Sequence, residues 1–322
     1  IEKGKLGTID SILGIIVLLW MTLGGGINAA FVFWAGHIAT PMLAGITALA
    51  TIFLVMTLID IPTSLYQTFV IEEKYGFNKS TAKQFIKDML MQLGLGAAIG
   101  FPILALILWV MDSVGSTWWL WAWAIIISFS LLMSWLFPTV IAPLFNKFTP
   151  MQEGSLKDRI QGLLARCGFN SQGIFIMDGS KRSGHGNAYF TGLGNNKRIV
   201  FFDTLVNSLD EEELEAGLAH ELGHFKRKHV IKMLAATSVM TLISLAILGW
   251  LINEVWFYNG LGVEQPSNAA ALLLFMLVSP VFTFFMQPIS AYFQRKFEFE
   301  ADDFAANNAK ATKMISGLVK LY

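Results

Sequence analysis

Long apolar stretches separated by short polar segments dominate this chain. No charged side chain occurs between residues 11 and 59. That stretch is too long for a single crossing, because a helix needs about 20 apolar residues to span a bilayer. We expect it to form two spans joined by a turn at residues 36–41. The same criterion predicts six spans, at about 11–34, 40–62, 89–111, 118–140, 233–253 and 268–291.

Composition supports a membrane protein. Charged residues make up 14% of the 322 residues, against about 25% in a soluble domain. The 23 basic residues equal the 23 acidic residues, so the basic excess expected of a nucleic-acid partner is lacking and we expect no nucleic acid. The single cysteine excludes an internal disulfide framework and a four-cysteine zinc site. The chain is therefore predicted to be a polytopic helical protein in contact with a lipid bilayer.

The positive charges fall on alternate segments between the expected spans. In chain order these segments hold 2, 0, 4, 0, 12, 0 and 5 lysines and arginines, which accounts for all 23. Loops rich in Lys and Arg remain on the cytoplasmic side. We therefore expect both ends of the chain and the long 141–232 segment to face the cytoplasm, at a bacterial inner membrane or an ER membrane.

The 141–232 segment has the pattern of a small α+β unit. Its apolar spacing predicts an amphipathic helix over 156–167 and short strands over 173–177, 187–191 and 198–202. Acidic residues after position 209 favour the start of another helix, which we expect to continue into the fifth span. The predicted organisation is membrane spans in 1–140 and 233–291, a cytoplasmic metalloprotease part in 141–232 and a cytoplasmic helix in 292–322.

The helix after residue 209 carries His220, Glu221 and His224 in the pattern His-Glu-x-x-His. Residues four apart share one helical face, so both imidazoles can reach one ion. A catalytic Zn²⁺ binds neutral histidines and keeps a position for water, from which the adjacent Glu221 can take a proton. A solvated charged helix is the alternative, but the motif's place between an α+β segment and a membrane span favours one zinc ion.

A catalytic zinc site needs a third protein ligand. Glu298 follows the sixth span on the expected cytoplasmic side and is the preferred candidate, with His185 in a Ser/Gly loop as the alternative. His229 would lie off the ligand face of a continuous helix, and His37 is expected on the opposite side of the membrane.

Two further acids follow Glu298 closely. Asp302 is four residues later and shares its helical face, so its carboxylate is expected to accept the free N–H of a ligating histidine and fix its tautomer. Glu300 lies between them in the sequence, and we expect it to point elsewhere into solvent.

Together with the spans, these motifs make the chain similar to the integral-membrane zinc CAAX prenyl proteases, whose zinc motifs are of the gluzincin type. The resemblance covers nearly the whole chain. It is carried by His-Glu-x-x-His, by Glu-x-x-x-Asp and by the segments 141–146, 177–180, 187–190, 202–205 and 297–302.

The resemblance implies a seven-helix barrel around a water-filled chamber, with the zinc site on the cytoplasmic side. It also implies His220, His224 and Glu298 as ligands, Glu221 as catalytic base and Asp302 as the supporting acid. By comparison with the family, we expect a first helix ahead of Ile1 and a C-terminal segment with further active-site groups beyond Tyr322.

The resulting hypothesis is a zinc endopeptidase that cleaves near the C-terminus of prenylated or other membrane-associated polypeptides. Asn187, Ala188 and Tyr189 form a plausible edge strand for an extended substrate. Two other functions stay open: a quality-control membrane protease without prenyl specificity, and a transporter or channel in which residues 24–26 (Gly-Gly-Gly) break a helix. The oligomeric state is not predicted.

Overall fold

The computed structural model describes residues 2–191 and 197–321. It separates into two compact units, which are described one at a time. The spanning unit comprises the described residues of Ile1–Tyr75, Lys83–Ile127 and Ser238–Met286. The sheet unit comprises those of Gly76–Ala82, Ser128–Thr237 and Gln287–Tyr322.

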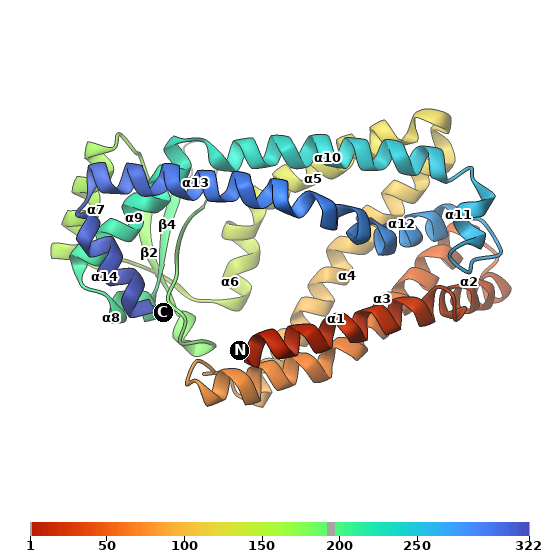
Figure 1. The fold of residues 1–322 in the computed structure, drawn as a ribbon, viewed down its shortest axis with the longest axis horizontal. Helices are drawn as coiled ribbons and strands as arrows, with labels where there is room; N and C mark the ends of the chain where they lie inside the picture. Colours follow the sequence, from red (N-terminus) through yellow and green to blue (C-terminus); the bar gives the residue numbers. More distant parts are fainter. Residues whose placement is uncertain (1, 192–196, 322) are drawn as a thin grey trace. The chain divides into compact units, whose positions relative to one another are not determined.

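Helices make up most of the chain (Figure 1). The longer α-helices are α1 (Glu2–Met21), α2 (Gly26–His37), α3 (Pro41–Tyr66), α4 (Ala82–Ser113), α5 (Trp118–Leu136), α7 (Ser155–Arg166), α9 (Glu211–Lys226), α10 (His229–Leu251), α12 (Asn268–Thr283), α13 (Gln287–Asn308) and α14 (Ala311–Leu321). Shorter α-helices are α6 (Ala142–Phe145), α8 (Asp203–Ser208) and α11 (Val255–Asn259). Brief π or 3₁₀ turns are η1 (Gln67–Glu72), η2 (Gly115–Thr117), η3 (Phe137–Ile141), η4 (Gly179–Lys181) and η5 (Phe284–Met286).

Among the described residues, six helices or helical runs are long and apolar enough to cross a membrane. They are Glu2–Met21, Pro41–Glu72, Ala82–Ser113, Gly115–Phe145, His229–Leu251 and Asn268–Asn308. Five of the six expected spans overlap one such run closely. The chain is a multi-pass membrane protein.

The first expected span was placed wrongly. The structure has no continuous helix over 11–34, because α1 begins at Glu2 and ends at Met21, and α2 begins at Gly26. Gly25 has a φ of 79°, in the left-handed region that glycine adopts freely. A Cβ on Gly24 would lie 2.4 Å from the carbonyl oxygen of Trp20. The triple glycine therefore ends one helix and starts the next.

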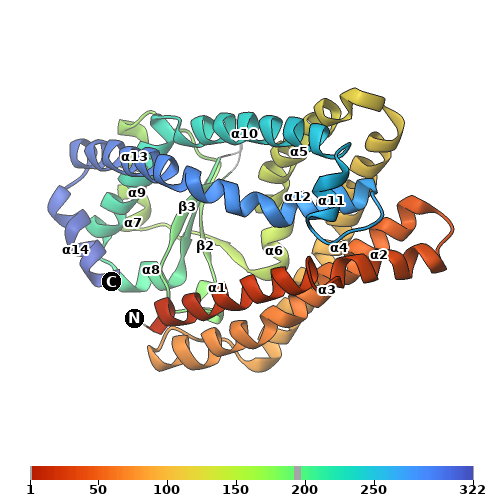
Figure 2. The same cartoon turned by 45° about the vertical axis from the view of Figure 1, so that its right-hand side comes forward.

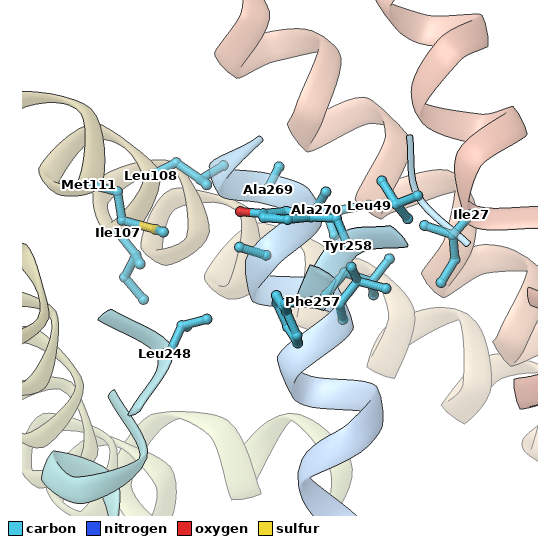
Figure 3. Packing of buried hydrophobic residues seen from close by; sticks show 14 of the residues in the cluster. Ile27, Leu49, Ile107, Leu108, Met111, Leu248, Phe257, Tyr258, Ala269 and Ala270 are labelled. Carbon is cyan, nitrogen blue, oxygen red and sulfur yellow. The ribbon is translucent and has the colours of Figure 1, made fainter. Parts of the chain in front are cut away.

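Apolar side chains form the core cluster of the spanning unit. Figure 3 shows Phe257 and Tyr258 packed with Leu49, Ala269 and Ala270. The helices approach closely where small residues meet. A Cβ on Gly45 of α3 would lie 2.7 Å from the Cβ of Ala269 in α12, which is the close packing typical of membrane helices.

The sheet unit contains four described strands in the order β1-β2-β4-β3. They are β1 (Phe148–Pro150), β2 (Gly173–Met177), β3 (Ala188–Thr191) and β4 (Arg198–Phe202). β2 and β4 are parallel, and the two outer pairs are antiparallel. The strand expected at 187–191 is β3, which begins one residue later, at Ala188. It is an edge strand of the sheet. Buried side chains of α7, α9, β2 and β4 form the core of this unit.

The helix that carries the His-Glu-x-x-His motif does not continue into the fifth span, contrary to expectation. α9 ends at Lys226, and α10 begins at His229. Lys228 between them has a φ of 57°, the only positive φ at a non-glycine residue in the described part of the chain. L-residues adopt this conformation at a cost in free energy. The left-handed backbone of Lys228 therefore marks a specific break between the two helices.

Candidate metal centre

α9 has a well-defined start. The Asp210 carboxylate accepts hydrogen bonds from the backbone N–H groups of Glu212 and Glu213, and the Glu213 carboxylate accepts one from the N–H of Asp210. This reciprocal cap satisfies backbone donors that a helix otherwise leaves unpaired. It fixes where the helix begins and hence the face on which the next turns place His220 and His224.

α9 lies against α13 within the sheet unit, as Figures 1 and 2 show. The two helices approach closely at Gly223, between the two motif histidines. A Cβ there would lie 2.8 Å from the Cα and 3.0 Å from the carbonyl oxygen of Ala301. Gly223 therefore lets the backbone of α13 come near enough for its acidic side chains to meet the histidines of α9.

Three side chains meet at this contact. The Nε2 atoms of His220 and His224 are 3.1 Å apart, and Glu298 Oε2 lies 3.3 Å from the first and 3.7 Å from the second. Ligands bound about 2.0–2.1 Å from a tetrahedral zinc are about 3.3 Å apart. Among the described residues this trio is the one cluster whose ligand atoms could hold a metal ion.

The His220 imidazole has the partner that the sequence indicated. Its Nδ1 lies 2.8 Å from Asp302 Oδ1. When His220 Nδ1 carries the hydrogen and donates it to this carboxylate, the lone pair on Nε2 points toward the other two ligand atoms, on His224 and Glu298.

The His224 imidazole has a partner that sequence reasoning missed. His224 Nδ1 lies 3.0 Å from His229 Nδ1, and His229 Nε2 lies 3.0 Å from Glu300 Oε2. His229 lies outside the ligand trio, but its contact with His224 was not foreseen, and the expectation that Glu300 points into solvent was wrong. The His229 contact was missed because α9 was treated as continuous, whereas the break before α10 turns His229 back toward His224. The partner of Glu300 was missed because its spacing from Glu298 and Asp302 on α13 does not reveal which residue of α10 it faces.

Burial shifts the pKa of two side chains of the His-Glu-x-x-His motif, Glu221 and His224. Burial raises the pKa of the Glu221 carboxyl, against the opposing influence of His220. Burial also lowers the pKa of His224, and the neighbouring His220 lowers it further. The first shift suits a proton acceptor, and the second favours the neutral imidazole that a metal requires.

A pocket of about 610 Å³ within the sheet unit is lined by two members of the trio, His220 and Glu298. Glu221 and Glu298 line it together with Asn187 and Ala188 at the start of β3. The Phe202 N–H donates to the carbonyl of Asn187, and the Asn187 side chain accepts from the N–H of Ala188. The ladder alternation turns that Ala188 N–H away from β4, toward the outer edge of β3.

Two other candidates occupy different places. The His185 ring stacks on Phe77, with centroids 4.1 Å apart, and belongs to the pocket lining but not to the trio. The Tyr189 ring lies edge-on to Phe202, and burial raises the pKa of its hydroxyl. Tyr189 is not among the residues that line the pocket.

Comparison with known proteins identifies the family. Residues 1–147 match a model described as the CAAX prenyl protease N-terminal region with five membrane helices, and residues 150–322 match peptidase family M48. The chain belongs to peptidase family M48.

Curated relatives carry names of the same kind as the N-terminal family model. The chain is 42% identical over 256 residues to a CAAX prenyl protease 1 homolog of Dictyostelium discoideum, covering 78% of this chain and 60% of the relative. It is 35% identical over 301 residues to CAAX prenyl protease 1 of Saccharomyces cerevisiae, covering 88% and 66%. The chain thus spans less than two thirds of the length of these relatives.

A solved structure has the same fold. The crystal structure of S. mikatae Ste24p superposes with a TM-score of 0.90 at 34% identity, covering 99% of this chain and 79% of that chain. The match confirms the predicted fold class, a polytopic helical membrane protein with a small α+β metalloprotease part.

Proposed function

We propose that this chain is a membrane zinc endopeptidase acting on the C-terminal region of prenylated polypeptides. The observation that carries the proposal is the meeting of His220, His224 and Glu298, next to a pocket that Glu221 lines together with the start of an edge strand. Membership of a peptidase family agrees with it and disfavours the transporter alternative.

The donor set suits a single Zn²⁺. Two imidazole nitrogens and one carboxylate oxygen are a ligand set found in catalytic zinc sites, which leaves the fourth position for water or substrate. The spacings of 3.1, 3.3 and 3.7 Å between the ligand atoms agree with this coordination. When bound, zinc polarises a peptide carbonyl and lowers the pKa of a water molecule.

Within this proposal, Glu221 handles the proton of the reaction. Its carboxylate takes a proton from the attacking water and passes it to the leaving amine. The raised pKa of this carboxyl, caused by burial, brings its affinity for a proton closer to what both transfers need. Asp302 holds the Nδ1 hydrogen of His220, which keeps that imidazole in the ligating tautomer.

The substrate backbone is proposed to pair with the outer edge of β3. The Ala188 N–H is turned to that edge and is held by the side chain of its neighbour Asn187, which an incoming carbonyl could replace. Strand addition uses main-chain hydrogen bonds and makes few demands on side chains. The names of the relatives, CAAX prenyl proteases, support a prenylated substrate. The alternation of basic loops supports a site on the cytoplasmic side.

The test compares two peptides on the purified full chain. One ends in a farnesylated cysteine followed by three residues, and the other is identical but unprenylated. We expect cleavage after the cysteine of the farnesylated peptide, abolished by a chelator and restored by added Zn²⁺. Equal cleavage of both peptides would favour the quality-control protease, and cleavage insensitive to chelation would contradict a metallopeptidase.

A further inference from the structure

The second motif histidine belongs to a buried chain of hydrogen bonds. His224 Nδ1 faces His229 Nδ1 at 3.0 Å, and His229 Nε2 faces Glu300 Oε2 at 3.0 Å. His229 is 1% exposed, and its ring stacks on Phe297 with centroids 4.2 Å apart and planes 15° from parallel. Side chains of three helices, α9, α10 and α13, therefore hold one imidazole in a single orientation.

Counting hydrogens assigns the tautomers along this chain. A metal on His224 Nε2 uses that lone pair, so the hydrogen of the neutral ring is on Nδ1. One hydrogen fits between two nitrogens 3.0 Å apart, so His229 Nδ1 must accept it. The hydrogen of neutral His229 is then on Nε2, where the Glu300 carboxylate accepts it. The opposite tautomer of His229 would place two hydrogens in one contact and a lone pair against a carboxylate.

We propose that His229 and Glu300 are positioning residues that fix His224 in its ligating tautomer and orientation. This inference rests on the proposed metal centre. The two histidine ligands then have unlike supports: Asp302 contacts His220 directly and is 49% exposed, whereas Glu300 acts on His224 through the buried His229.

The backbone and a nearby charge support this arrangement. The left-handed Lys228 ends the turn after α9 and lets α10 begin at His229 instead of extending the first helix. Lys232, one turn later, has its Nζ 3.9 Å from Glu300 Oε2 and 5.3 Å from the centre of the Phe297 ring. This cation favours the ionised Glu300 that the hydrogen count requires.

The decisive variants change the acceptor and keep the packing. His229→Phe preserves a ring against Phe297 but removes the acceptor for His224. His229→Asn offers an amide oxygen near the place of Nδ1 and is the conservative rescue. Glu300→Ala removes the acceptor for the His229 Nε2 hydrogen and leaves both imidazole rings in place. It tests the inference independently if H229F folds poorly. His37→Phe, at an exposed histidine of α2, is the matched control.

Zinc affinity is measured by competition with a chromophoric chelator on the full chain, with thermal unfolding of the metal-free protein alongside. We expect H229F and E300A to weaken zinc binding by about 10–100-fold, the usual effect of losing groups that orient a ligand. H229N and H37F should stay near the parent value. The visible absorption of the Co²⁺-loaded protein should shift in H229F and not in H37F.

The outcomes separate this inference from the proposed function. Parent protein that binds no stoichiometric zinc would overturn both. Parent protein that binds one zinc, with H229F and E300A of unchanged affinity and unchanged Co²⁺ spectrum, would overturn the positioning role alone. A loss of thermal stability in the metal-free variants that accounts for the whole loss of zinc would assign the pair to folding and also overturn the inference.

Discussion

Each unit contains a pair of helices that meet at a glycine, and the two contacts serve different ends. In the spanning unit, Gly45 of α3 faces Ala269 of α12, and a Cβ would come within 2.7 Å of the alanine methyl. In the sheet unit, Gly223 of α9 faces Ala301 of α13, and a Cβ would come within 2.8 Å of its Cα. Both alanines are buried.

The surroundings of the two contacts differ. Apolar side chains flank Gly45, where a small shift of a helix changes only packing. Histidines and acids flank Gly223, where ligand atoms must stay within a few tenths of an ångström of their places. A similar packing device therefore stabilises the fold in one unit and sets the geometry of the candidate metal centre in the other.

The largest effect is expected from removal of the ligand that α13 contributes. Glu298→Ala should abolish stoichiometric zinc binding, because two histidines alone leave the site without its third protein ligand. Zinc content of the purified protein is the measurement, and His185→Ala is the control that should retain the metal. Zinc retained in E298A and lost in H185A would transfer the third ligand to His185.

A smaller effect is expected from the glycine between the histidines. Gly223→Ala adds one methyl against the backbone of Ala301, which cannot rotate away, so α9 and α13 must separate. We expect zinc affinity to fall by about 10–100-fold, in the range produced by loss of ligand orientation. The same chelator competition measures it, and unchanged affinity would show that the close approach does not set the site geometry.

The matching change in the spanning unit should affect stability alone. Gly45→Ala places a methyl 2.7 Å from the Ala269 methyl, and overpacking of this kind costs about 1–3 kcal/mol. Gly94→Ala in α4, with nothing within 4 Å of the new methyl, is the control and should gain up to about 1 kcal/mol from helix propensity. Thermal unfolding in detergent compares them, with zinc affinity expected to stay constant in both.

Helical spacing on one continuous helix predicted the pairing of His220 with His224 and of Glu298 with Asp302, and the expected topology pointed to Glu298 as the third ligand. Helical spacing failed at His229, since no glycine or proline marks the break at Arg227 and Lys228. The first span failed for the opposite reason. Its triple glycine is plain in the sequence, but either helix packing or a helix break could explain it. Which helices meet at Gly45 and Gly223 depends on tertiary packing, which periodicity does not encode.

The smallest predicted effect concerns the link between α9 and α14. Hydrogen bonds from Lys313 and Lys320 to Asp210 and Glu213 hold the pKa of each carboxyl below its usual value. Because the pKa is lowered in the folded state, this stabilisation is present above the unfolded value of about 4 and is lost as pH falls through the lower folded value.

Hydrogen exchange measures this effect. After correction for intrinsic rates, α14 amides should exchange faster at a pH well below 4 than at pH 7, while α3 amides should not. Equal protection of α14 at both pH values would show that these charges do not hold the helix in place.

The central claim is that Glu221 is the proton acceptor of a zinc peptidase, and Glu221→Gln tests it most directly. The variant keeps the shape of the side chain and leaves all three proposed ligands intact. We predict one zinc per chain in the purified variant and cleavage of the farnesylated peptide reduced by at least about 10²-fold, the lower end of what a general base contributes. Cleavage near the parent rate with zinc retained would show that Glu221 is not the proton acceptor.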